Sequence, residues 1–162
     1  MFKKGDTVVY PVYGVGIIEG IEKKAIADHV YTFFMLRIVE TDYTIMIPME
    51  NAEKVGLRLP ADKKTAAKVW KILRDVSSPP DTQTWNRRQR DYNDKIKTGD
   101  LQQLAIVLRD LYLLAQKKEL SYGERKMMET ARNLLVGELA AAVREKPEKI
   151  IAKIEAIFQE PK

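Results

Sequence analysis

The feature that most constrains this fold is a change of periodicity near residues 56–60. Before this point, β-branched and aromatic residues form short runs bounded by glycine and proline. After it, apolar residues recur every three or four positions, as on one face of a helix. The two periods require different backbone geometries. We therefore expect two domains, residues 1–60 and residues 61–162.

The first domain is predicted to contain only strands. Several short strands within fifty residues are typical of a small antiparallel barrel. His29 is predicted to lie in a turn beside Asp28. The expected strands cover residues 6–10, 14–21, 30–39 and 43–48.

The second domain is predicted to be a bundle of about five helices. Its segments begin at residues that accept a hydrogen bond from the first helical turn, or at a proline that suits that turn. Ser77–Pro80 breaks the pattern after the first helix, and Gly99 is placed to end the second. The predicted starts are Asp62, Asp81 or Thr82, Asp100, the Ser121–Glu124 capping box and Pro147.

The residue inventory argues against catalysis and against a bound metal or cofactor. The chain has no cysteine and a single histidine, His29. A typical zinc site and a nucleophilic triad therefore cannot be assembled. Gly14 and Gly16 lack the third glycine of a phosphate-cradling loop. No apolar run reaches the ~20 residues of a membrane span, and Met1–Asp6 lacks a signal-peptide core. We expect a cytoplasmic protein with no membrane partner and no small-molecule substrate.

The net positive charge is confined to the second domain. Residues 1–60 carry 7 Lys/Arg and 8 Asp/Glu, a net charge of −1, and residues 61–162 carry 21 and 15, a net charge of +6. A basic domain beside a near-neutral one indicates two different partners, one of them polyanionic. The alternative is an ordinary solvated, lysine-rich helical surface.

Trp85 begins a segment in which three arginines follow within five residues. Arg88 is predicted to share the helical side of Trp85, whereas Arg87 and Arg90 point elsewhere. Arginine binds phosphate oxygens in a bidentate manner, and an aromatic ring can stack on an unpaired base. The pattern is equally compatible with a core tryptophan on a solvated helix. A second basic set comprises Arg125, Lys126 and Arg132.

Six segments in order along the chain resemble the CarD/CdnL family of bacterial RNA-polymerase-binding transcription regulators. Each is a weak motif alone, but six at consistent spacing are specific. They are Gly5–Pro11, Tyr43–Pro48, Val55–Arg58, Thr84–Arg88, Leu108–Leu111 and Leu120–Met127.

The resemblance implies a Tudor/SH3-like barrel that docks on the RNA polymerase β subunit, followed by a helical DNA-binding domain. The helical domain would contact promoter DNA at the upstream edge of the transcription bubble, without base-sequence specificity. There the tryptophan that matches Trp85 wedges into the fork and stabilises the open complex. The matching DNA-binding residues are Trp85, Arg87, Arg88, Arg90, Arg125, Lys126 and Arg132. The matching polymerase-binding residues are Lys24, Met35, Met46 and Pro48.

One departure from the family pattern and two alternative functions stay open. Some family members carry arginine where this chain has Lys24 and Met46, so polar pairing with polymerase is in doubt there. A protein-interaction adaptor with merely solvated basic helices is the main alternative. An enzyme acting on nucleic acid would need a metal or a general base that the sequence does not offer.

Overall fold

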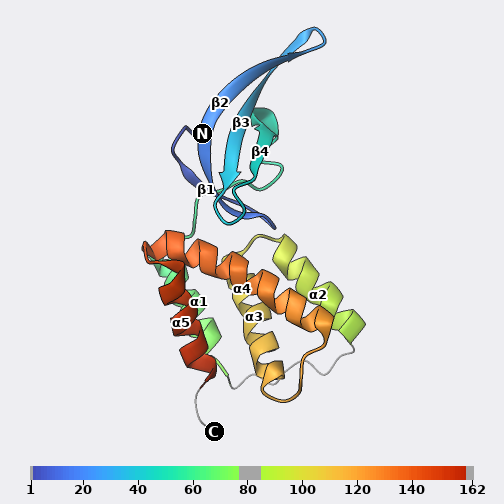
Figure 1. The fold of residues 1–162 in the computed structure, drawn as a ribbon, viewed down its shortest axis with the longest axis vertical. Coiled ribbons are helices and arrows are strands. Elements are labelled where there is room, and N and C mark those ends of the chain that lie inside the picture. The colour runs from blue at the N-terminus through green and yellow to red at the C-terminus, as the bar shows by residue number, and fades with distance from the viewer. Residues whose placement is uncertain (1, 77–84, 160–162) are drawn as a thin grey trace. The chain divides into compact units, whose positions relative to one another are not determined.

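The computed structural model describes residues 2–76 and 85–159, and the chain divides into two compact units, Met1–Pro60 and Ala61–Lys162. The first unit is a four-stranded antiparallel sheet, and the second consists of helices (Figure 1). This confirms the predicted class, a small curled β-domain followed by an all-α part with five helices in the described residues.

The sheet follows the order of the chain. Its strands are β1 (Thr7–Tyr10), β2 (Gly14–Ile26), β3 (His29–Ile38) and β4 (Thr44–Pro48), each antiparallel to the next. A 3₁₀ turn, η1 (Met49–Asn51), follows β4. The returning chain forms a bridge between Arg58 and Val9, which covers the outer edge of β1. In the described residues β4 pairs only with β3, so its other edge is free.

One face of the sheet builds the core of this unit. The fully buried side chains include Ile18, Phe34 and Leu36. A Cβ on Gly16 would lie 2.6 Å from Leu36 Cδ1, so only glycine lets β2 pass this close to the core. The register between β2 and β3 shifts at Ile18–Gly20, which suits the curl of a small barrel.

The β2–β3 hairpin is longer than the sequence predicts. Its register continues to Ile26 and His29, and both strands extend beyond their neighbours as a two-stranded ribbon (Figure 1). The prediction that His29 lies in a turn is wrong, because the two-residue turn is Ala27–Asp28 and His29 begins β3. The extension carries exposed side chains on both faces, so no hydrophobic alternation marks it in the sequence.

The helical unit packs around one core. Its helices are α1 (Lys63–Arg74), α2 (Trp85–Lys97), α3 (Leu101–Ala115), α4 (Tyr122–Val143) and α5 (Pro147–Phe158). Leu108, Leu111, Leu135 and Ile154 are completely buried between them. Trp70 is only partly buried against this core. The Arg74 guanidinium lies 6.0 Å from the centroid of the Trp70 ring.

The predicted caps are confirmed wherever they fall on described residues. Asp62 accepts from Thr65 N at 2.8 Å, and Asp100 accepts from Gln102 N at 2.9 Å. Ser121 and Glu124 form the reciprocal capping box. Gly99 follows α2 with φ of 71°, as a helix end requires. The proposed caps Asp81 and Thr82 lie outside the described residues.

Candidate polymerase and nucleic-acid surfaces

The outward face of the sheet brings together the four residues predicted to bind polymerase. Met35 and Met46 are direct partners across β3 and β4, and Phe33 is paired with Pro48. Lys24 reaches this face from β2, with its Nζ 3.8 Å from Met46 Sδ. The sequence neighbours Phe34 and Ile47 point into the core instead.

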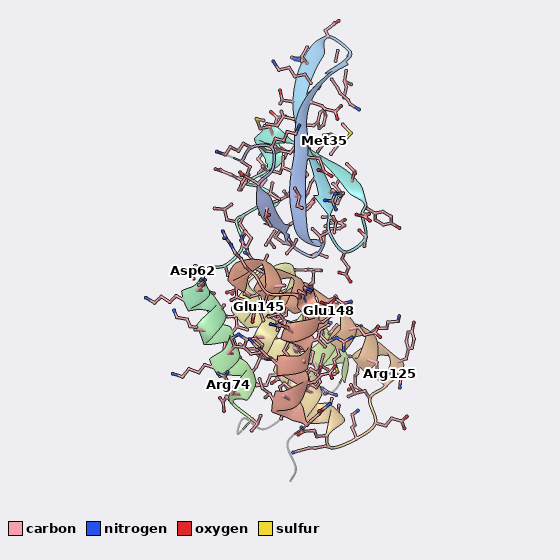
Figure 2. The ribbon with its side chains drawn as sticks, turned by 60° about the vertical axis from the view of Figure 1, so that its left-hand side comes forward. Met35, Asp62, Arg74, Arg125, Glu145 and Glu148 are labelled. Carbon is pink, nitrogen blue, oxygen red and sulfur yellow. The ribbon has the colours of Figure 1, made fainter. Side chains whose placement is uncertain are left out.

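The centre of this face, around Met35 and Met46, is apolar and partly open to solvent, and Lys24 and the Arg37–Glu19 ion pair border it. Met46 is 37% exposed on the edge strand β4, and Figure 2 labels Met35 on the adjoining strand. Strand edges and exposed methionines both favour protein contacts. A surface hollow of ≈ 400 Å³ adjoins the edge at Pro48. It is lined by Val30, Tyr31, Thr32, Pro48, Met49 and Glu50.

All the predicted DNA residues except Arg132 lie in the first two turns of α2 and α4, which the Arg88–Glu124 ion pair brings together. Arg87 and Arg90 on α2 are exposed, as are Arg125 and Lys126 on α4. Figure 2 shows Arg125 on the outside of the helical unit. The Arg125 guanidinium donates to Leu120 O at 3.2 Å, which leaves its other nitrogens for a ligand. Trp85 is the first residue of α2, and its side chain lies outside the described residues.

Arg88 has a different environment from its neighbours. Its side chain is 8% exposed, and Nη2 lies 3.3 Å from Oε2 of Glu124, which is 1% exposed. Glu124 also accepts from Ser121 N at 2.8 Å and pairs with Lys118 Nζ at 3.2 Å. Arg88 is expected from the sequence to bind DNA. In the structure its guanidinium instead joins α2 to α4 through Glu124, and this contact competes with DNA binding.

The ionisation of Glu124 supports this structural role. Burial raises the pKa of the Glu124 carboxyl, but hydrogen bonds from Ser121 and Lys118 outweigh that effect and hold its pKa below the ordinary 4.5. The carboxylate is therefore charged at neutral pH, as a partner for Arg88 must be.

Arg132 is also turned toward the protein. It is partly buried, and its Nε has no hydrogen-bond partner among the described residues. Burial raises the pKa of Tyr112, and a hydrogen bond with Arg132 opposes that shift. Tyr112 in turn stacks on Phe158 at 4.4 Å between ring centroids. Arg132 thus belongs to the contact between α3, α4 and α5.

Tyr122 is a further candidate, although in the sequence it stands out only as part of the capping motif of α4. It is 69% exposed in the first turn of α4, and Lys126 Nζ lies 5.6 Å from its ring centroid. An exposed aromatic ring beside Arg125 and Lys126 suits a base or a sugar. The sequence contained one sign of this exposure. Tyr122 directly follows the N-cap, whereas the buried face of α4 begins only at Glu124 and Met127.

No group of three or more metal-binding side chains occurs in the residues that the structure describes. None of the described helices is long and apolar enough to cross a membrane.

Each of the two units matches a known protein family. Residues 2–59 match the family described as "CarD-like/TRCF RID domain", and residues 68–155 match "CarD, C-terminal domain". The "Putative transcription factor YdeB" of Bacillus subtilis (strain 168) is 34% identical over 139 residues, which cover 86% of this chain and 90% of that protein. A solved structure, "CdnLNt from Myxoccoccus xanthus", is 46% identical with a TM-score of 0.33, covering 36% of this chain and 83% of that one.

These matches define a transcription regulator whose N-terminal unit is of the kind that interacts with RNA polymerase. The chain belongs to the CarD family.

Proposed function

We propose that this protein docks on the β subunit of RNA polymerase through the outward face of its sheet. Its helical unit then holds promoter DNA at the upstream edge of the transcription bubble and stabilises the open complex. The observation that carries the proposal is the pairing of Met35 with Met46 at the free edge of β4, inside the matched RID domain. An exposed apolar edge is what a partner strand can extend.

The DNA contact consists of the exposed cations on α2 and α4. Arg87, Arg90, Arg125 and Lys126 would bind phosphates, and Trp85 would wedge at the fork. Phosphate contacts and a wedge respond to DNA shape, not to base identity. Arg88 is proposed as a positioning residue because it pairs with Glu124. We leave Arg132 out of the DNA contact because of its packing beside Tyr112.

The test uses the full-length protein and two immobilised partners, purified β subunit and forked promoter DNA. We expect both to retain the protein, and only DNA retention to weaken steeply with salt. An adaptor without DNA binding would be retained by the β subunit alone. That alternative is favoured by the inward orientation of Arg88 and Arg132, so the DNA arm of the experiment decides between the two functions.

A further inference from the structure

Helix α1 concentrates the positive charge of the helical unit. It contains five Lys/Arg and no Asp/Glu between Lys63 and Arg74. Helix α2 sets five Lys/Arg against two Asp, while in α3, α4 and α5 the acidic and basic residues are equal in number. The largest local excess of charge therefore lies outside the helices that the sequence patterns associate with DNA.

The cations of α1 cover the side opposite its core face. Ala66, Val69 and Leu73 are buried, whereas all five cations are exposed. At 100° per residue, Lys64, Lys68 and Lys71 lie within about 60° of one another. They span roughly 10 Å along the axis, the rise of about three nucleotides of one DNA strand.

Salt bridges do not neutralise this row. In the described part of the chain, none of the four lysines of α1 forms an ion pair. Elsewhere in the unit, Lys95 pairs with Asp91 and Lys153 with Glu145. The charges of α1 thus remain available to an external anion.

The row is also placed unfavourably for the helix itself. Lys63 and Lys64 stand in the first turn, which has no acidic residue, and the positive end of the helix dipole disfavours cations there. The exposed N-cap Asp62 attracts Lys64, but an exposed pair of this kind contributes little to stability. The two charges are therefore of little use to folding, which points to a role outside the fold.

We infer that the α1 face, defined as Lys63, Lys64, Lys68, Lys71 and Arg74, binds the backbone of duplex DNA as a second, sequence-independent contact. The inference rests on the proposed DNA-binding function and extends it. Figure 2 shows Arg74 and Arg125 on opposite sides of the helical unit, so the two contacts are separate surfaces. The apolar side of α1 is committed to the core, which leaves no apolar face to insert into a lipid surface.

The test compares two triple variants of the full-length protein that remove equal charge. Lys64→Gln/Lys68→Gln/Lys71→Gln alters the α1 face, and Lys146→Gln/Lys149→Gln/Lys153→Gln alters exposed lysines at α5. Affinity for a blunt duplex is measured by fluorescence anisotropy at several salt concentrations. The α1 variant should flatten the slope of log affinity against log salt by roughly 0.9 per lost contact, up to three contacts. The α5 variant should leave the slope nearly unchanged, and Lys→Arg at the three α1 positions should preserve it.

Equal slopes for the two glutamine variants, or no change in either, would overturn the inference. So would binding to phosphatidylglycerol vesicles or to a polyglutamate peptide that depends on α1 while duplex binding does not. Both variants should melt within a few degrees of the wild-type temperature, because the Lys153–Glu145 pair that the α5 variant loses is solvent-exposed, and this keeps misfolding out of the comparison. Failure of the proposed function is a separate result, in which the wild-type protein shows no preference for forked over blunt DNA.

Discussion

Arg88 of α2 and Glu124 of α4 form a buried ion pair, with Nη2 3.3 Å from Oε2, although 36 residues separate them in the chain. Glu124 simultaneously closes the capping box of α4. The pair therefore fixes the first turn of α2 against the first turn of α4. Those two turns carry the exposed arginines proposed to hold DNA, so a buried contact sets the geometry of an exposed one.

Removing Glu124 should destabilise the helical unit strongly. Glu124→Ala loses the capping box and leaves the Arg88 guanidinium without this buried carboxylate, at a cost of about 3–5 kcal/mol in the free energy of unfolding. Glu129→Ala, on the exposed side of the same helix, should change it by less than about 0.5 kcal/mol. Urea denaturation measures both. Similar values for the two variants would show that the buried pair contributes no more than surface charge.

The same carboxylate should make stability depend on acid. The pKa of Glu124 is lower in the folded protein than its ordinary 4.5, so the unfolded chain binds the proton more readily. The stabilising contribution of Glu124 is therefore complete above the pKa of the unfolded chain. It is lost as the pH falls through the lower pKa of the folded protein. We expect the unfolding free energy of the wild type to fall more steeply than that of Glu124→Gln as the pH drops below 4.5. If the unfolding free energies of the two proteins changed in parallel with pH, Glu124 would not be the group responsible.

Met46→Asp should abolish binding to the polymerase β subunit. The substitution places a carboxylate in the exposed Met35–Met46 pair without touching the core residues Phe34 and Ile47. Val39→Asp, at a side chain that is 48% exposed beyond the end of β3, is the matched control and should bind normally. Co-precipitation with purified β subunit measures both. A folded Met46→Asp protein that binds fully would place the docking surface elsewhere.

A salt titration of DNA binding should distinguish the exposed Arg87 and Arg125 from the inward-facing Arg132. Arg87→Ala or Arg125→Ala should flatten the slope of log affinity against log salt by roughly 0.9 each on duplex DNA, whatever its sequence. Arg132→Ala should leave the slope unchanged and lower the melting temperature, because this side chain packs beside Tyr112. A loss that varies with base identity would mean that Arg87 or Arg125 reads bases.

Trp85→Ala tests the wedge directly. Base stacking on an aromatic ring is worth ~1–3 kcal/mol, so the open promoter complex should dissociate about 5- to 100-fold faster. Polymerase binding should be unchanged because the sheet provides it. The melting temperature of the same variant is the control, since truncation of a core tryptophan costs ~3–5 kcal/mol. A large drop in melting temperature with an unaltered lifetime would assign Trp85 to the core.

Local signals in the sequence were sufficient for the order of strands and helices and for the caps of α1, α3 and α4. Asp62, Asp100 and Ser121 each bond to a backbone N–H two or three residues away, so the motif and its effect lie within one helical turn. The change of period near residues 56–60 likewise separates two kinds of backbone before any tertiary contact forms. The length of the β2–β3 hairpin escaped this reasoning because its exposed end, from Ile21 to Ile26, has no buried face to impose alternation.

The orientation of the cations was decided only by tertiary structure. Helical periodicity separates Arg88 from Arg87 and Arg90, but it does not show what Arg88 faces. The fold supplies that partner, a buried carboxylate brought to Arg88 by a helix 36 residues away. The α1 face was equally invisible, because a lysine row becomes significant only when packing has assigned the opposite side of the helix to the core. Sequence fixes which residues can be charged, and packing determines which charges solvent and DNA can reach.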